Sequence, residues 1–241
     1  MNLISVVRDF NMFDKCIRNN LNCSGMSFHI YDNRKENKPI PICYNNFLEQ
    51  YDYSNDSWFV FCHEDFELQE NISVFINGLD KKSLHGVVGG RRKGLCGFGM
   101  QVIYGNMMEK NRDGSGEAWF PGRFVSKPVV VEAFDCCCLM VHSSLVEKYN
   151  LRFDENLYFD FYVEDFCAMA KVKSSILSYV LPVKCCHHSG SKATERLYRH
   201  LPYLAQKYKK NCFVGTLTYF GTPNWQKRLQ DKMMSWLRLC N

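Results

Sequence analysis

An apolar run over Trp58 to Cys62 ends abruptly at a polar triplet, His63-Glu64-Asp65. The β-branched and aromatic character of the run predicts a short buried strand. In an open α/β sheet, ligands bind beyond the carboxyl ends of the strands, so acids at this place can reach one. Mg2+ and Mn2+ prefer carboxylate oxygens, and a diphosphate supplies further oxygen ligands. The triplet therefore predicts a metal and diphosphate site, although a solvated acidic turn explains it about as well when it is taken alone.

Three other polar clusters also follow a predicted strand or open a predicted helix: Asp32-Asn33, Glu164-Asp165 and His187-His188. Near a helix N-terminus, the helix dipole and free N–H groups favour an ionised carboxylate. A histidine after a strand can complete an oxygen-rich metal site. Ordinary helix-end charge and structural histidines are the alternatives for each cluster alone. Together the four clusters supply what an enzyme acting on nucleotide sugars requires. These are a polar side chain that recognises the nucleoside, metal ligands for the diphosphate, and a carboxylate base.

The elements that position these clusters alternate along the first third of the chain. Strands are expected at residues 3–7, 27–31, 58–62 and 84–88, and helices at 9–20, 44–51 and 70–79. Repeated β-α-β units with short connections are typical of a doubly wound, mostly parallel sheet. We therefore predict that the first strand, the strand ending near His63 and the strand near Leu84 are parallel neighbours. Asp32 and Asp65 should then open on the same edge of that sheet.

Residues 89–127 interrupt the alternation. They hold nine of the fifteen glycines and show little periodicity, which predicts a long loop that acts as a lid or binding segment. Arg91 opens this segment with two further cations and is expected to face a phosphate, unless the three form a solvated edge. Beyond it, strands are expected at 129–133, 137–141 and 176–183, helices from 143 and over 164–172, and a helical tail from 194.

The composition fits one large domain, or one domain with an appendage. Hydrophobic residues make up 46% of the 241 residues, enough for a buried core and too many for a disordered chain. The formal net charge of +5 is compatible with an anionic ligand or membrane surface and too weak to indicate a nucleic-acid partner. No run reaches the roughly 18–20 apolar residues of a membrane-spanning helix, so an integral membrane protein is not expected.

Thirteen cysteines are present, an odd number, and several are adjacent, as in Cys136-Cys137-Cys138. Neighbouring residues of a strand point to opposite faces, so adjacent cysteines cannot easily share a partner. No CxxC pair and no N-terminal signal sequence is found, so reduced, buried thiols in a cytoplasmic protein are expected. A hydrolase built on Cys186 and a neighbouring histidine is disfavoured, because no nucleophile-elbow pattern or orienting third residue is found.

The end of the chain has a basic amphipathic pattern. Over 225–239, lysines and arginines flank one helical stripe of apolar residues: Trp225, Leu229, Met233, Trp236 and Leu237. Such a helix can lie in a membrane interface, or it can simply pack on the rest of the protein. The first alternative predicts a peripheral location on the inner face of a membrane.

The most specific pattern lies in the second half of the chain: Phe153-Asp154-Glu155, then Tyr158-Phe159, then Glu164-Asp165-Phe166-Cys167. It is similar to the FDE…F…ED pattern of family 2 glycosyltransferases with a GT-A fold. Over roughly residues 1–192, the order of features resembles the short bacterial branch of that family.

Other motifs carry the same resemblance. Residues 60–65 stand where the family has its metal-binding DXD motif, Tyr44-Asn45 resembles its YN segment, and His187-His188 resembles its late histidine. The chain departs from the family at residues 8–11, which replace Pro-x-Tyr-Asn, at His63, where DXD begins with an aspartate, and in lacking the QxxRW signature of processive synthases.

The resemblance implies an α/β fold of GT-A type: a doubly wound, mostly parallel sheet flanked by helices, with a helical C-terminal tail. It implies a glycosyltransferase domain over 1–192, with a nucleotide-binding half (1–90) and an acceptor and catalytic half (91–192), and a helical extension over 193–241. The implied activity is inverting transfer of a sugar from a nucleoside diphosphate sugar to a hydroxyl of a glycan or lipid-linked acceptor, in surface polysaccharide or lipopolysaccharide synthesis. A non-catalytic nucleotide-sugar-binding module of the same fold is the alternative.

The resemblance also implies roles for single residues. Asp165 would be the catalytic base, with Glu164 as its competitor, and the aromatic residues 158–162 would line the acceptor pocket. Mn2+ or Mg2+ would be held by Asp65, His187 and His188. The donor would contact Asp32, near the base or ribose, together with Asn45, Glu64 and Arg91.

Overall fold

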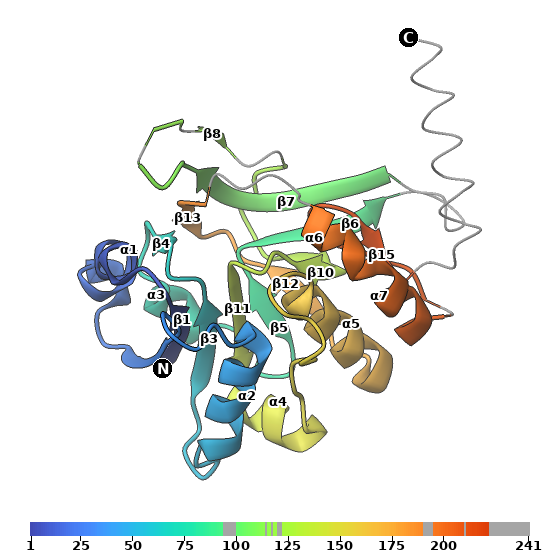
Figure 1. Ribbon diagram of the computed structural model, residues 1–241, viewed down its shortest axis with the longest axis horizontal. Helices are drawn as coiled ribbons and strands as arrows, with labels where there is room; N and C mark the ends of the chain where they lie inside the picture. The colour runs from blue at the N-terminus through green and yellow to red at the C-terminus, as the bar shows by residue number, and fades with distance from the viewer. Residues whose placement is uncertain are drawn as a thin grey trace.

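A seven-stranded mixed sheet forms the centre of the protein in a computed structural model, which describes residues 1–93, 100–113, 115–116, 118–119, 122–189, 195–209 and 211–221. The strand order is β2-β1-β3-β11-β5-β12-β9 (Figure 1). These strands are β1 (Asn2–Val7), β2 (Ser27–Asp32), β3 (Trp58–Cys62), β5 (Leu84–Gly86), β9 (Val129–Val131), β11 (Cys138–His142) and β12 (Ser178–Val180).

Most strands of this sheet run in the same direction, as the sequence predicts. β1 pairs in parallel with both β2 and β3, and β12 pairs in parallel with β5. β11 is antiparallel to its two neighbours, β3 and β5, and β9 is antiparallel to β12. Asp32 ends β2 and Asp65 follows β3, so their expected position on one edge of the sheet is confirmed.

The expectation that the strand near Leu84 lies directly beside the strand ending at His63 is wrong, because β11 lies between β3 and β5. All five residues of β11 are buried. A strand that is buried on both faces suits the middle of a sheet, but its order among other strands depends on pairing with residues far along the chain. Periodicity along the sequence does not contain that information.

Alternate residues of the central strands face two separate apolar layers. Ile4, Phe59 and Phe61 pack in one cluster with residues of the helices α2 (Ile40–Gln50), α4 (Ser143–Tyr149) and α5 (Tyr162–Ser174). Leu3 and Val60 pack in the other cluster, on the side of α1 (Phe10–Phe13) and the π-helical turn η1 (Asp14–Arg18). This two-sided burial explains why these strands read as continuous apolar runs.

A second sheet has the order β10-β6-β7-β13-β4, with β8 paired to β7. Its strands are β4 (Phe66–Leu68), β6 (Val88–Lys93), β7 (Met100–Glu109), β8 (Ala118–Trp119), β10 (Ala133–Phe134) and β13 (Lys184–His187). The loop predicted over 89–127 is therefore wrong over 89–93 and 100–109, because β6 and β7 form an antiparallel ribbon there, and over 118–119, where β8 pairs with β7. Glycine weakens a strand pattern, yet one position demands it: a Cβ on Gly90 would lie 2.1 Å from the Gly215 carbonyl oxygen.

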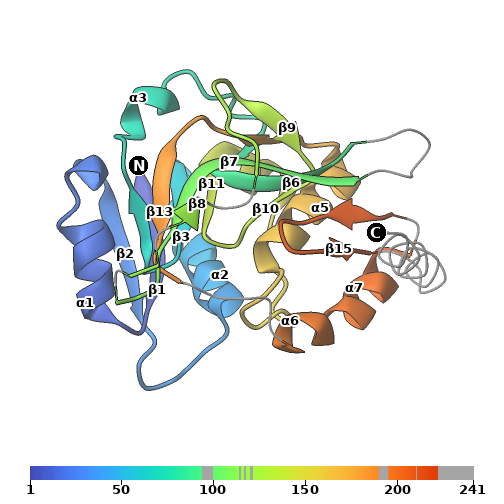
Figure 2. The same cartoon turned by 90° about the horizontal axis from the view of Figure 1, so that it is seen from above.

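The described part of the tail contains α6 (Glu195–Arg199) and α7 (Leu201–Lys207), followed by a hairpin of β14 (Phe213–Val214) and β15 (Tyr219–Phe220). The tail is thus only partly helical. It lies on the opposite side of the molecule from α1 (Figure 2). The amphipathic segment 225–239 lies outside the described residues. The remaining short helices are η2 (Leu21–Cys23) and α3 (Ser73–Ile76).

Two expectations about composition can be compared with the described residues. The cysteines that the structure describes are thiols rather than disulfides, and most are buried. In the same part of the chain, every helix is too short or too polar to cross a membrane.

Candidate functional site

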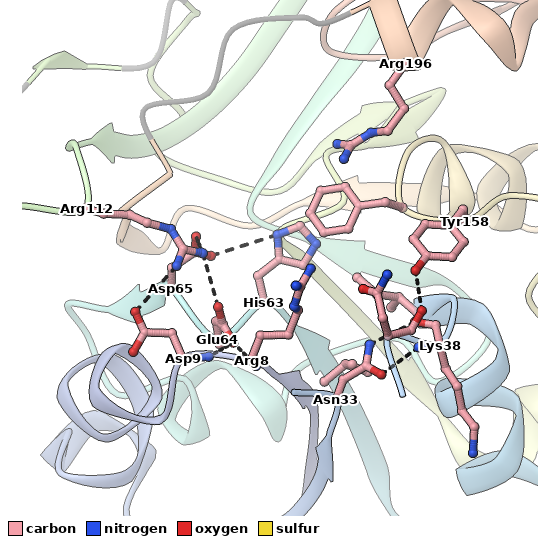
Figure 3. A pocket seen from close by; sticks show the side chains of 14 residues that line it. Arg8, Asp9, Asn33, Lys38, His63, Glu64, Asp65, Arg112, Tyr158 and Arg196 are labelled. Atoms are coloured by element: carbon pink, nitrogen blue, oxygen red, sulfur yellow. Dashed lines mark hydrogen bonds and ion pairs between the residues drawn. The ribbon is translucent and has the colours of Figure 1, made fainter. Parts of the chain in front are cut away.

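A cavity of about 550 Å³ opens at the edge of the central sheet where β1, β2 and β3 end. The residues that directly follow these strands project into it, as expected for an open parallel sheet (Figure 3). Its lining comprises Val6, Arg8, Asp9, Asn33, Asn37, Lys38, Ile40, His63, Glu64, Asp65, Arg112, Tyr158, Phe159 and Arg196.

Asp65 and His63, which line the cavity, form a group of possible metal ligands together with His187, which lies outside the lining. One oxygen of Asp65, Oδ1, lies 3.3 Å from Nε2 of His187 and 4.0 Å from Nδ1 of His63. Asp65 Oδ1 and His187 Nε2 are both buried and have no hydrogen-bond partner among the described residues. Ligand atoms of the three side chains all lie within 4.8 Å of one another. Unpartnered buried polar atoms are costly, and a divalent cation bound to them would remove that cost.

The register of the second sheet brings His187 to this place. β13 pairs antiparallel with β4, and His187 lies opposite Phe66, the residue after Asp65. The backbone N–H of His188 also donates to the carbonyl oxygen of Asp65 at 2.9 Å. Residues more than 120 positions apart are thus held side by side by main-chain hydrogen bonds.

Hydrogen bonding selects the tautomer of His63 that leaves Nδ1 free for a cation. Tyr162 Oη donates its proton to the carbonyl oxygen of Cys136 at 3.0 Å. His63 Nε2, at 2.7 Å from the same hydroxyl, must therefore donate to it, and Nδ1 keeps its lone pair on the side of Asp65. Burial lowers the pKa of His63, which favours the neutral ring that a metal ligand needs.

The charges at Asp65 are strongly coupled. Burial alone would raise the pKa of Asp65, but His187, His63 and Arg112 together hold this pKa well below its usual range. Burial alone would lower the pKa of His187, but the Asp65 carboxylate outweighs it and raises this pKa. A cation at this position would therefore compete with the proton that the raised pKa favours on His187.

Arg112 covers the acidic side of the cavity. Its Nη2 lies 3.1 Å from Glu64 Oε1 and 3.2 Å from Asp65 Oδ2, and its Nη1 lies 3.6 Å from Asp9 Oδ2. Half of this side chain is exposed, and it reaches in from the segment after β7 (Figure 3). The other oxygen of Glu64 accepts the backbone N–H groups of Arg8 and Asp9. Glu64 therefore fixes the turn after β1 as well as lining the cavity.

Aromatic and basic side chains form the opposite wall. The Phe159 ring stacks on His63, with ring centroids 5.5 Å apart. The Arg196 guanidinium lies 4.4 Å from the centroid of the Phe159 ring and donates to Asp160 at 2.6 Å. Tyr158, next to Phe159, donates its hydroxyl proton to the carbonyl oxygen of Asn37. Figure 3 shows Arg196 and Arg8 approaching the cavity from opposite sides. Of the aromatic segment 158–162, expected from the sequence to line an acceptor pocket, Tyr158 and Phe159 line this cavity and residues 160–162 do not.

Five of the predicted ligand-binding residues lie outside this lining, and one of them, His187, still contacts Asp65. Asp32 is exposed and paired with Arg34 at 2.6 Å, although its neighbour Asn33 lines the cavity. Asn45 is buried and joins α2 to residues 153–155 through three hydrogen bonds of 2.9 Å. Arg91 is an exposed residue of β6. His188 bonds to Glu67 at 2.7 Å and is not a member of the group formed by Asp65, His63 and His187.

Both predicted base residues are buried at the start of α5 and do not line the cavity. Asp165 accepts a hydrogen bond from Tyr208 Oη at 2.7 Å and forms an ion pair with Lys207 Nζ at 2.8 Å. Burial raises the pKa of Asp165 against the opposing effect of these two partners. Glu164 accepts a hydrogen bond from the Cys136 thiol at 3.0 Å. Burial, together with the nearby Asp135, raises the pKa of Glu164 to about 8.

Several lining residues were not predicted as ligand contacts. His63 was assigned to the acidic motif without a role, and Arg8 directly follows the first strand, so the strand-end rule that selects Asp65 would also have selected Arg8. Arg112 and Arg196 do not directly follow a predicted strand, so the strand-end rule does not select them. They enter the site only because distant segments fold over the ends of the strands.

Comparison with known proteins supports the fold. No family model matches the sequence, and no curated protein matches it either. Among solved structures, S. aureus TarS residues 1–349, a glycosyltransferase, matches with a TM-score of 0.50 and 11% sequence identity. The match covers 87% of this chain and 65% of that one. The protein therefore has a glycosyltransferase-like fold, and its membership of family 2 stays a prediction.

Proposed function

We propose that this protein is a glycosyltransferase that uses a nucleoside diphosphate sugar as donor and a divalent cation, Mn2+ or Mg2+, as cofactor. The observation that carries the proposal is the pair of buried ligand atoms on Asp65 and His187, which face each other at 3.3 Å without a hydrogen bond, at the edge of the sheet where such folds bind ligands. The glycosyltransferase-like fold supports a nucleotide sugar and an acceptor as substrates in general.

In this proposal Asp65, His187 and His63 hold the cation. Their donor set of one carboxylate and two imidazoles suits Mn2+ better than Ca2+ and still accepts Mg2+ when phosphate oxygens complete the shell. When bound, the cation would stabilise the charge that develops on the leaving diphosphate. Arg112 and Arg8 would contact the same diphosphate, because both line the cavity and Arg112 is ion-paired with the acidic motif.

The remaining lining would bind the nucleoside and the sugars. Asn33 and Lys38 lie beyond β2, where Asn33 is fixed by two hydrogen bonds to the Lys38 backbone. We place the nucleoside on that side. Phe159 and Tyr158 offer aromatic faces for a sugar ring, and Arg196 beside them would favour an acceptor with polar or anionic groups. A lipid-linked acceptor, a role in surface polysaccharide synthesis and peripheral membrane contact remain proposals from the sequence.

Transfer with inversion would require a base to take the acceptor's proton, a step worth about 10²–10⁴-fold. Asp165 is retained as the proposed base and Glu164 as its competitor. Because both carboxyl groups are buried and neither lines the cavity, the proposal requires α7 to release Asp165 from Lys207 when substrates bind.

A screen of nucleotide sugars tests the proposal. The melting temperature should rise with one nucleoside diphosphate sugar, and the rise should be larger with Mn2+ than with EDTA. The Asp65→Asn protein should lose the metal-dependent part of this rise. Asp56→Asn, an exposed aspartate at the opposite end of β3, is the matched control and should keep it. Equal stabilisation with Mn2+ and with EDTA would contradict the metal role, and no stabilisation by any donor would contradict the function.

A module that binds a nucleotide sugar without transferring it is the second candidate. The observation that favours it is the ion-paired, buried state of Asp165. Release of free nucleotide from the donor identified in the screen separates the two functions: a transferase releases it continuously with acceptor, and a binding module does not.

A further inference from the structure

We propose that Cys16, Glu67 and His188 form a second cation site, structural in role and selective for Zn2+ or a similar thiophilic divalent ion. This site is independent of the proposed catalytic function, because it shares no side chain with the cavity.

Three distant segments bring these side chains together. Cys16 lies in η1, Glu67 is the middle residue of β4, and His188 directly follows β13. Figure 1 shows α1, which η1 continues, beside β4. Antiparallel pairing of β13 with β4 brings His188 to Glu67, and His188 Nε2 lies 2.7 Å from Glu67 Oε2. One ligand atom from each of the three residues lies within 4.8 Å of the other two.

The burial of the group favours a bound ion over a simple surface ion pair. Cys16 is fully buried and His188 is 2% exposed, yet Nδ1 of His188 has no hydrogen-bond partner among the described residues. Nε2 is the ring nitrogen beside Glu67, so the ring keeps a second buried nitrogen that no described residue satisfies. The Glu67 side chain is one-third exposed, which leaves a route from solvent to the group.

The types of donor select the ion. One thiolate, one imidazole and one carboxylate are ligands that Zn2+ accepts together, usually in tetrahedral geometry with a fourth ligand such as water. Mg2+ and Ca2+ prefer oxygen ligands alone and would not compete well for a sulfur. On binding, the Cys16 sulfur exchanges its proton for the ion, and the proton leaves to solvent.

Such an ion would tie η1 to the β4–β13 pair. That pair carries both Asp65 and His187 at the same end, so the second site would stiffen the support of the proposed catalytic metal without touching it. Zn2+ should therefore raise the melting temperature of the folded protein through mass action.

Titration of the reduced full-length protein with Co2+, a coloured substitute for Zn2+, tests the proposal. A thiolate ligand produces an intense near-ultraviolet charge-transfer band, and the group at Asp65 has no sulfur and cannot produce it. The wild-type protein should show the band at one equivalent, and Zn2+ but not excess Mg2+ should abolish it. Cys16→Ser should lose the band, whereas Cys23→Ser, a buried cysteine of the same apolar cluster, should keep it.

Two further variants keep the proposal testable if Cys16→Ser does not fold. Glu67→Gln should bind Co2+ at least ~10-fold more weakly, and Asp65→Ala should keep the band, since its loss affects the other site. The proposal would be overturned if the wild-type protein lacked the band or if Cys16→Ser kept it. It would equally be overturned if Glu67→Gln bound Co2+ with unchanged affinity or if Asp65→Ala lost the band. None of these outcomes tests the proposed glycosyltransferase function. That function depends on the metal site at Asp65, which is tested separately by nucleotide-dependent thermal stabilisation.

Discussion

Asp65 and His187, which lie 122 positions apart in the chain, present an oxygen and a nitrogen to each other at 3.3 Å, both buried and without a hydrogen-bond partner in the described residues. Asp65 follows a strand of the central sheet, and His187 ends a strand of the second sheet. Asp65 also directly precedes β4, which pairs with β13, so strand pairing within the second sheet is what creates the proposed metal site.

Replacement of either residue should abolish tight Mn2+ binding. Asp65→Asn removes the charged ligand and His187→Gln removes the imidazole, and calorimetry should show at least ~10-fold weaker binding for each. His188→Gln is the matched control and should leave this binding unchanged, because His188 faces Glu67 instead. If His188→Gln weakened Mn2+ binding as much as His187→Gln, the assignment of ligands would be wrong.

Removal of Arg112 should change metal and nucleotide binding in opposite directions. The guanidinium forms ion pairs with Glu64 and Asp65. Arg112→Gln therefore removes a positive charge that competes with the cation for Asp65, and it should strengthen Mn2+ binding several-fold. The same change removes a phosphate partner and should weaken nucleoside diphosphate binding. Arg18→Gln, an exposed residue of η1, should alter neither. A variant that weakened both would show that Arg112 only supports the fold of the site.

The roles of Asp165 and Glu164 can be separated by turnover. Asp165→Asn should lose transfer while donor binding is kept, because Asn cannot accept the acceptor's proton. Tyr208→Phe is the control: it removes the hydrogen bond to Asp165 and leaves the carboxylate. If Glu164→Gln lost transfer and Asp165→Asn did not, Glu164 would be the base. Retention of activity in both would exclude the proposed mechanism.

Glu164 should make the protein less stable as the pH rises. Its pKa is about 8 in the folded protein and 4.5 as the ordinary value, so between these values only the folded state holds the proton. The free energy of unfolding should then fall by roughly 1 kcal/mol per pH unit from about pH 4.5 to 8 through this group. Denaturant unfolding of Glu164→Gln should lack that slope. The exposed Glu147→Gln should retain it, and identical slopes in both variants would contradict the assignment.

We expect Asn45 to stabilise the fold rather than to bind the donor. Asn45→Ala breaks three buried hydrogen bonds between α2 and residues 153–155, and the loss should be about 2–4 kcal/mol in unfolding free energy. Donor affinity of the folded protein should stay unchanged, in contrast to the role that the sequence suggests. If Asn45→Ala instead weakened donor binding without lowering the free energy of unfolding, Asn45 would be a donor contact. Asn156→Ala, on the surface, serves as control.

The sequence alone determined the features that depend on local pattern. The apolar run 58–62 followed by acids identified β3 and the edge of the site, and the alternation of strands and helices predicted a largely parallel sheet with Asp32 and Asp65 on one edge. Asp9 caps a helix as expected, since its side chain accepts the N–H of Met12. Such patterns are readable because a buried strand or a helix cap is specified by neighbours in the chain.

Only the tertiary structure decided which residues meet. The insertion of β11 beside β3, the ribbon formed by the glycine-rich segment, the choice of His187 over His188 for Asp65, and the arrival of Arg112 and Arg196 at the cavity all result from strand pairing and packing between distant segments. A shift of one residue in the register of β13 would exchange the two histidines, because successive side chains point to opposite faces. Register is set by the whole sheet and by what its faces bury, and neither is visible in a local stretch of sequence.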